Sequence, residues 1–494
     1  MIMDSNSFVQ RWAECLERGA GAVFLGAGLS CGAGYPTWQK LLLDIARELG
    51  LDIEQEHDLA GVAQYSLNRE NRQRHKLSAL IAQSFPPKAP PETFRILARL
   101  PLRHIWTTNY DKLAETAWAE ERKSLDVKSQ NDDLGIDKPW AHGVLYKMHG
   151  TIDHPRDVVI AKDDYELYRR SRAGFLQVLA GHLVSRQFLF LGFSFTDPNL
   201  AHLFASIRET FRDNGPEHYA IVRRPKRGTG RQAGRRFRLD KVRHALWVED
   251  LKRYGIQCVE IDEFDEIDLL LKDVENCLAR RSVFVSGSFP DAYSPSDLSG
   301  RKFVEDVAHD IGVLIAKKQK RLVSGFGLVV GNATMAGTLS IALADDTPNL
   351  EKSILLRPFP QTSVPGLSAS EFKRRYRESM VRQAGVCIFI AGIKDEDRGG
   401  NVRRVDAPGV KEEFETAKRL ERMLIPIGAT GGAAEKLWEL VERERQVLCP
   451  GASRKDFSTL KTSRSVAQIV RAVGRILDAG DTAAHRRKKQ SRRV

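Results

Sequence analysis

Short apolar segments alternate with amphipathic helical patterns along most of this chain of 494 residues. This alternation is typical of α/β folds, because each parallel strand needs a crossover connection, usually a helix, before the next strand can pair with it. The strongest apolar segments, Phe188–Phe195 and Val386–Ile393, have the length of strands. They are far shorter than the ~18–20 residues that span a bilayer. We therefore expect parallel sheets covered by helices, and no membrane span.

The alternation starts afresh at Ser282, directly after a helical pattern that ends near Arg280. The first series predicts strands at 22–26, 104–108, 145–148, 187–192, 218–222 and 256–261, and helices at 36–49, 164–185, 239–254 and 266–280, with a largely helical stretch over 58–100. The second predicts strands at 282–287, 321–325, 353–359, 386–392 and 424–428, and helices at 299–319, 332–343, 369–384, 410–422, 433–446 and 463–478. We expect two tandem Rossmann-like domains with doubly wound parallel sheets, at 1–280 and 281–479, and a basic, disordered tail at 480–494.

Charge and cysteine content narrow the classes of function. The net charge of +13 is concentrated at 223–238 and 485–494, but no aromatic residues are interleaved for base stacking. A solvated loop and a disordered tail are therefore expected rather than a nucleic-acid interface. The six cysteines form no C-x-x-C pair, so no metal site is expected. Sparse cysteine and the lack of a secretory signal pattern predict a cytoplasmic protein.

A glycine-rich turn, GAGLSCGAGYPTW at 26–38, follows the first predicted strand. Glycines let backbone N–H groups approach a pyrophosphate, and the helix N-terminus that follows favours negative charge. Taken alone, such a turn is weak evidence, because many glycine-rich turns serve packing only.

Four segments in order resemble the sirtuins: the turn at 26–38, TTNYD at 107–111, YKMHG at 146–150 and LGFSFTDPNL at 191–200. The resemblance covers about residues 5–280 and is strongest to the divergent bacterial sirtuin-like (SIR2-like) branch of antiphage defence proteins. It implies NAD⁺ as substrate and a catalytic pair. The implied catalytic residues are Asn109 and His149, and the implied NAD-binding residues are Gly26, Ala27, Gly28, Ser30, Asp111, Gly192, Ser194 and Asp197.

The residue types suit the cleavage of NAD⁺. Nicotinamide is a cationic leaving group on an anomeric carbon, and it departs through an oxocarbenium-like state. Asn109 can hold a ribose hydroxyl or a water, and His149 can accept a proton near neutral pH. Asp111 can bind the nicotinamide amide or stabilise its loop.

Two departures from the sirtuin pattern favour an NAD⁺ glycohydrolase over a protein deacylase. The four-cysteine zinc module is missing, and Trp38-Gln39 replaces the usual Phe-Arg. Two alternatives remain open, an NAD-dependent deacylase or ADP-ribosyltransferase, and a non-enzymatic nucleotide-binding protein.

The second half has its own glycine-rich turn, SGFGLVVGNATMAG, which resembles that of the SLOG family of Rossmann-like sensors. PGVKEEF at 408–414 is similar to a degraded form of a SLOG catalytic motif, which favours binding over catalysis, although acids at a helix start also stabilise its dipole. The implied activator-binding residues are Gly287, Ser288, Gly325, Phe326, Gly327, Arg357, Lys373, Arg374 and Glu412.

A sirtuin-like half followed by a SLOG half resembles the NAD-hydrolysing effectors of Thoeris antiphage defence. This resemblance implies activation by a cyclic ADP-ribose isomer that a TIR-domain partner protein makes. It also implies assembly as a homotetramer.

Overall fold

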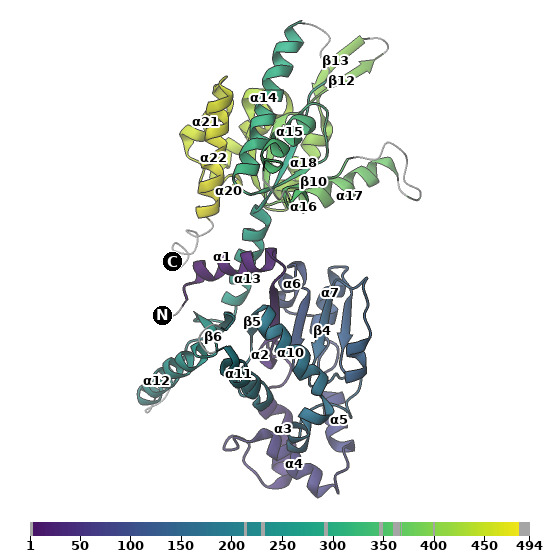
Figure 1. The fold of residues 1–494 in the computed structure, drawn as a ribbon, viewed down its shortest axis with the longest axis vertical. Helices are drawn as coiled ribbons and strands as arrows, with labels where there is room; N and C mark the ends of the chain where they lie inside the picture. The colour runs from purple at the N-terminus through teal and green to yellow at the C-terminus, as the bar shows by residue number, and fades with distance from the viewer. Residues whose placement is uncertain are drawn as a thin grey trace. The chain divides into compact units, whose positions relative to one another are not determined.

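The computed structural model describes residues 3–483, except for 212–214, 229–232, 291–294, 345–348, 359–365, 367 and 399–400 (Figure 1). The chain divides between Glu275 and Asn276 into two compact units, here called unit 1 and unit 2. Each unit has its own parallel sheet, so the predicted fold class, two tandem Rossmann-like α/β folds, is confirmed. The division falls within one helix, α13 (Glu266–Arg280).

Unit 1 has a seven-stranded parallel sheet in the order β3-β4-β2-β1-β5-β6-β7. Its strands are β1 (Gly21–Leu25), β2 (His104–Thr107), β3 (Leu125–Lys128), β4 (Gly143–Lys147), β5 (Gln187–Leu191), β6 (His218–Arg223) and β7 (Ile256–Ile261). The central strand β1 is entirely buried. In register, Phe24 of β1 lies opposite Trp106 of β2 and Phe190 of β5. The chain order reverses between β1 and β5, where ligands bind in doubly wound sheets.

The helices of unit 1 follow the predicted pattern with local differences. They are α1 (Ser5–Glu17), α2 (Ala27–Gly32), α3 (Trp38–Leu49), α4 (Leu59–Arg69), α5 (His75–Ser84), α6 (Glu92–Arg99), α7 (Leu113–Glu120), the 3₁₀ helix η1 (Asn131–Gly135), α8 (Lys162–Glu166), α9 (Tyr168–Ser171), α10 (Ala173–Ser185), α11 (Pro198–Phe211), α12 (Ala233–Lys252) and α13. The single helix predicted at 164–185 was wrong, because the backbone of Arg172, at φ −131°, interrupts it. Four α-helices were not predicted: α1, the short α2 inside the glycine-rich turn, α7 and α11.

Strand β3 was also missed, because its inward-facing residues are charged. Asp126 and Lys128 are both buried and form an ion pair of 2.8 Å. Apolar periodicity cannot reveal a strand whose buried positions carry opposite charges. The pair keeps each charge compensated at the edge of the sheet.

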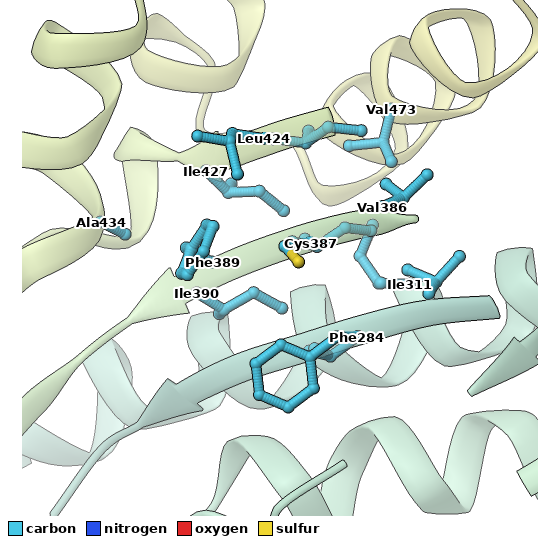
Figure 2. Close-up of a cluster of buried hydrophobic side chains, with 14 of the residues drawn as sticks. Phe284, Ile311, Val386, Cys387, Phe389, Ile390, Leu424, Ile427, Ala434 and Val473 are labelled. Atoms are coloured by element: carbon cyan, nitrogen blue, oxygen red, sulfur yellow. The ribbon is translucent and has the colours of Figure 1, made fainter. Parts of the chain in front are cut away.

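Unit 2 has a five-stranded parallel sheet in the order β10-β9-β8-β11-β14, the five strands that the sequence predicts. They are β8 (Ser282–Ser288), β9 (Arg321–Ser324), β10 (Ile354–Leu356), β11 (Val386–Ala391) and β14 (Met423–Ile427). Figure 2 shows Phe284 of β8, Phe389 of β11 and Leu424 of β14 in one apolar core. Helical side chains such as Ile311 and Val473 complete this core.

A charged antiparallel hairpin and several helices complete unit 2. The hairpin, which was not predicted, consists of β12 (Ile393–Arg398) and β13 (Asn401–Asp406). The helices are α14 (Pro295–Lys317), α15 (Val330–Ala342), α16 (Leu350–Ser353), α17 (Ala369–Val381), α18 (Pro408–Arg419), η3 (Gly428–Thr430), α19 (Gly432–Arg443), α20 (Arg445–Leu448), α21 (Arg454–Thr462) and α22 (Val466–Ala483). Helix α22 takes in the start of the predicted tail, and 484–494 lie outside the described residues. Within the described parts of both units, no helix is long and apolar enough for a bilayer.

Helices α14 and α15 pack backbone against backbone through two glycines. A Cβ atom added to Gly312 of α14 would overlap the carbonyl oxygen of Thr334, and one added to Gly337 of α15 would overlap that of His309. Thr338 donates its hydroxyl to Gly312 O at 3.2 Å across the contact. The separation of these helices therefore depends on two residues without side chains.

We predict that Gly312→Ala or Gly337→Ala lowers the unfolding free energy of unit 2 by about 2 kcal/mol or more, because overpacking forces backbone shifts. The control is Gly300→Ala in α14, where the nearest atom to an added Cβ is a side-chain carbon at 3.8 Å. Alanine there is expected to stabilise the helix by up to about 1 kcal/mol. Urea unfolding of the full chain measures both effects. Equal stabilities for the three variants would contradict the prediction.

Candidate active site

A cavity of about 1220 Å³ lies within unit 1, at the carboxyl ends of its central strands. The segments after β1, β2, β4 and β5 all contribute to its lining. Every predicted site residue of the sirtuin-like half except Gly26 lines this cavity. These residues are Ala27, Gly28, Ser30, Asn109, Asp111, His149, Gly192, Ser194 and Asp197. The cavity therefore brings together residues that lie up to 170 positions apart (27 to 197).

Gly26, Gly28 and Gly192 allow the backbone of the turn after β1 to pack against the backbone at the end of β5. The N–H of Gly26 donates to Leu191 O at 2.8 Å, and the N–H of Gly28 donates to Gly192 O at 3.0 Å. A Cβ on Gly26 would overlap Gly192 O, and Gly192 itself has a φ of +62°, which side chains disfavour. The Gly28 N–H is thus engaged within the protein.

A chain of polar side chains connects Asn109 to this turn. The Asn109 amide donates to Gly26 O at 3.1 Å and to Ser30 Oγ at 2.9 Å, and Ser30 Oγ donates to Asp111 Oδ2 at 2.6 Å. The other amide atom, Asn109 Oδ1, is buried and accepts no hydrogen bond from any described residue. A buried acceptor without a partner is costly, so it marks a position for a ligand hydroxyl or a water.

Lys147, in the same motif as His149, fixes the loop that carries Asn109. Its ammonium group is fully buried and donates to Tyr110 O at 3.2 Å, to Asp111 O, and to Glu115 Oε1 at 2.9 Å. The carboxylate and the two carbonyl groups compensate a charge that would otherwise be expensive to bury. The end of β4 and the loop after β2 therefore hold each other in place.

His149 lies between a carboxylate and two tyrosine rings. Its Nε2 atom is 3.1 Å from Asp197 Oδ2, but the ring is not aligned for a hydrogen bond, so Nε2 has no such partner among the described residues. The rings of Tyr165 and Tyr168 contact the imidazole edge-on, with centroids 5.5 and 5.8 Å away. These contacts hold the imidazole in one orientation beside the cavity.

Asp197, predicted as an NAD contact, connects His149 to helix α11. Its Oδ1 accepts the N–H groups of Asn199 at 2.9 Å and Leu200 at 3.1 Å, at the start of that helix. Burial raises the pKa of Asp197, but the contact with His149 and these N–H groups outweigh it, and the pKa lies below its usual value. Asp197 is thus held as a carboxylate beside the imidazole.

Several cavity residues were not predicted as site residues. Trp38, Tyr165 and Trp247 line the cavity, and so does Arg223, whose guanidinium lies 4.3 Å from the centroid of the Phe264 ring. Trp38 stands in the sirtuin-like signature and Arg223 begins the basic stretch, so the sequence held a weak signal for these two. Tyr165 and Trp247 are indistinguishable from ordinary helical core residues in the sequence.

In unit 2, most predicted activator-binding residues follow the carboxyl ends of neighbouring strands. Gly287 and Ser288 end β8, Gly325, Phe326 and Gly327 follow β9, and Arg357 follows β10. A Cβ on Gly327 would overlap Gly287 O, so the turns after β8 and β9 touch through their backbones. Arg357 donates from Nη1 to Ser379 Oγ of α17 at 3.3 Å.

The turn after β9 is strained. Val329 has φ 63° and ψ −62°, and the N–H of Val330 donates to Leu328 O at 2.7 Å, which closes a γ-turn of the rare type with positive φ. Such a conformation is unusual for a β-branched residue and persists only where its surroundings enforce it.

The cations of α17 divide between surface and interior. Lys373 and Arg374 are exposed, and Arg374 pairs with Glu371 of the same helix at 2.9 Å. Arg377 instead contacts Glu412, and its Nε lies 3.6 Å from Glu413 Oε1. The buried acid of the PGVKEEF segment is therefore Glu413, which accepts the Ser286 hydroxyl at 2.6 Å. Neither Arg377 nor Glu413 was among the predicted residues.

Burial raises the pKa of Glu413 to about 7, and the Ser286 hydrogen bond and the Arg377 charge offset only part of this effect. The folded state thus keeps a proton that the unfolded state releases near 4.5, the ordinary pKa of a glutamate side chain. We predict that the contribution of Glu413 to the unfolding free energy falls as the pH rises from about 4.5 to 7. Over that range the unfolding free energy of Glu413→Gln is expected to rise by on the order of 3 kcal/mol relative to that of the parent.

Urea unfolding of parent and variant at pH 5 and pH 8 measures this difference. Glu412→Gln, at an exposed neighbouring position, is the control and is expected to show little change with pH. If Glu413→Gln differs from the parent in unfolding free energy by the same amount at both pH values, the prediction that Glu413 is buried in its protonated form is wrong.

In the portion of the chain that the structure describes, no three His, Cys, Asp or Glu side chains are grouped so that they could hold a metal ion.

Comparisons with known proteins agree with this arrangement. A family model described as "SIR2-like domain" matches residues 103–246, and one described as "Sir2- and TIR-associating SLOG family" matches residues 266–480. The protein "NAD(+) hydrolase ThsA" of Bacillus cereus (strain MSX-D12) is 36% identical over 93% of this chain and 95% of its own length. Proteins of the same name from Enterococcus faecium and Acinetobacter baumannii (strain 532279) are 35% and 33% identical, over 96% and 95% of this chain and 98% and 97% of their own lengths. With this identity over nearly its full length, the chain belongs to the family of the ThsA NAD(+) hydrolases.

Proposed function

We propose that this chain is an NAD⁺ glycohydrolase that releases nicotinamide and ADP-ribose, and that it acts in the cytoplasm as an effector of antiphage defence. The unpartnered, buried Oδ1 of Asn109, in a cavity that His149 also lines, carries the proposal. The cavity volume suits an extended dinucleotide, and its lining combines aromatic walls with a few polar groups, as ligand sites generally do. The named activity of the relatives supports the same substrate.

The side chains divide the work of the reaction. The bond between the ribose anomeric carbon and the nicotinamide nitrogen breaks, and its electron pair leaves with nicotinamide, which becomes neutral. Asn109 Oδ1 accepts a hydrogen bond from a ribose hydroxyl or from the attacking water. That water bonds to the anomeric carbon, and His149, supported by Asp197, takes the proton that the water loses. Asn109 and His149 are both buried, which limits the access of other waters to the anomeric carbon.

We predict that Asn109→Ala and His149→Ala each lower NAD⁺ cleavage by about 100-fold or more, since acid–base groups typically contribute ~10²–10⁴ in rate. His142→Ala, which changes an exposed histidine of the same unit, is the control and is expected to keep full activity. Chromatography of nicotinamide and ADP-ribose measures the rate, and circular dichroism checks the fold. Full turnover in either folded site variant would refute the assignment.

Regulation by unit 2 is part of the proposal. A cyclic ADP-ribose isomer, made by a TIR-domain partner protein, binds at the strand ends of unit 2 and activates cleavage in a homotetramer. Two observations support this. Arg357 follows β10, which pairs with β9, and its backbone N–H donates to Ser324 O at the end of β9 at 2.9 Å, so a cation that suits a phosphate group follows the strand next to the turn after β9. The matching SLOG family is described as associating with Sir2 and TIR domains.

We predict that Arg357→Ala weakens binding of a cyclic ADP-ribose isomer at least about tenfold, because the phosphate loses a charged donor. The activator concentration needed for NAD⁺ cleavage is expected to rise by the same factor, because a weaker ligand fills its site only at a higher concentration. Lys455→Ala removes an exposed cation from α21 of the same unit and serves as the control. Calorimetry measures the affinity and an activator titration measures the turnover. Unchanged affinity and activation in Arg357→Ala would remove this residue from the site.

A further inference from the structure

One end of the cavity of unit 1 is formed by residues that no step of the proposed reaction uses. This end, here called the β6 compartment, is lined by Ile221, Val222 and Arg223 of β6, Trp247 of α12, and Phe264 and Ile267 after β7. Asn109 and His149 follow β2 and β4, which lie on the other side of the central strand β1. The cavity therefore extends well beyond the candidate catalytic residues.

A dinucleotide whose nicotinamide ribose reacts at Asn109 and His149 reaches the β6 compartment with its adenosine half. In the sheet, β1 and β5 lie between β2 and β6. At about 4.8 Å between neighbouring strands, the ends of β2 and β6 are roughly 14 Å apart. The switch point between β1 and β5, where ligands of doubly wound sheets bind, lies on the way. The adenosine ribose is thus directed to the end of β6, where Arg223 stands.

The guanidinium group of Arg223 has no counter-ion in the part of the chain that the structure describes. The acids after β7 are engaged by other cations. Asp262 accepts a hydrogen bond from Arg224 at 2.9 Å, and Glu263 pairs with Lys226. The positive charge of Arg223 at the edge of the cavity is therefore left for a ligand.

The surroundings of Arg223 suit an adenosine that carries an added negative charge. The guanidinium lies 4.3 Å from the centroid of the Phe264 ring, which is 57% exposed, and both flat groups can stack with a purine. All six residues of the β6 compartment are described, and none is acidic.

The lack of an acid there bears on which dinucleotide fits. In dinucleotide sites a carboxylate commonly accepts the ribose 2′-hydroxyl of NAD⁺, whereas an arginine accommodates the 2′-phosphate of NADP⁺. Such a phosphate carries a charge of about −1.5 to −2 at pH 7, and a guanidinium can bind it through two parallel hydrogen bonds.

We propose that this chain also cleaves NADP⁺, and that Arg223 binds the 2′-phosphate of this substrate. The proposal rests on the NAD⁺ glycohydrolase activity proposed above. The reaction is the same: the bond from the anomeric carbon to the nicotinamide nitrogen breaks, its electron pair leaves with nicotinamide, and water supplies the new hydroxyl and releases a proton. The second product is ADP-ribose that keeps its 2′-phosphate.

Steady-state cleavage of NADP⁺ and of NAD⁺ by the full chain tests the activity and the role of Arg223. Arg223→Ala is expected to lower the ratio of kcat/KM for NADP⁺ to that for NAD⁺ by about 10- to 100-fold, because a charged hydrogen-bond donor is lost. Arg223→Lys is expected to restore part of this ratio, since an ammonium group keeps the charge but not the paired donors. Lys226→Ala, which removes a cation already paired with Glu263 and outside the cavity lining, is the control and is expected to keep the parent ratio.

Calorimetry measures the same contact without turnover. Adenosine 2′,5′-bisphosphate and AMP differ only by the 2′-phosphate. The bisphosphate is expected to bind the parent at least about tenfold more tightly than AMP, and Arg223→Ala is expected to remove most of this difference. Binding to unit 2 is common to the parent and the variant, so only the part that changes with Arg223 is attributed to the β6 compartment.

The outcomes separate this proposal from the proposed function. A parent chain that cleaves NAD⁺ but neither cleaves NADP⁺ nor prefers the bisphosphate overturns this proposal alone. An unchanged substrate ratio together with an unchanged bisphosphate preference in Arg223→Ala removes Arg223 from the phosphate contact. A parent chain that cleaves neither dinucleotide refutes the proposed function and this activity with it.

Discussion

The close approach of two backbone segments, at the carboxyl ends of β1 and β5, underlies the candidate active site. Two backbone hydrogen bonds join the segments, from Gly26 to Leu191 and from Gly28 to Gly192. A side chain at Gly26 would push them apart, because its Cβ would overlap a carbonyl oxygen. Since the turn is held there, the Asn109 side-chain N–H can donate to Gly26 O. None of the described residues donates to Asn109 Oδ1, so this oxygen can accept a hydrogen bond from a ligand.

Buried charges then set the positions of the candidate catalytic side chains around this contact. Lys147 connects the end of β4 to the loop after β2 and to Glu115 of α7. Two residues later, His149 meets Asp197, which also caps α11. Each charged group is expensive to bury alone, so removing one partner would destabilise the others. The site is therefore rigid for electrostatic reasons as well as through packing.

Unit 2 shares the sheet design but differs in the chemistry at its strand ends. Its strand ends combine a strained turn at Val329 with a buried acid, Glu413, whose pKa is raised to about 7. Neither feature is needed for a stable sheet, and both cost folding free energy. Costs of this kind are commonly retained where a site must bind a ligand, as the sensing role proposed for this unit requires.

The sequence by itself determined the fold class, the strands of both central sheets apart from β3, and the four motifs that meet in the cavity, because local periodicity and glycine placement report on strands and turns. It could not show that Asp197 pairs with His149 rather than serving NAD alone, that Glu413 rather than Glu412 is buried, or that Tyr165 and Trp247 form cavity walls. It also missed β3, whose buried positions are an ion pair. These features arise from contacts between residues far apart in the chain. Only the packed sheet and helices decide which side chain meets which, and thus which charges leave water.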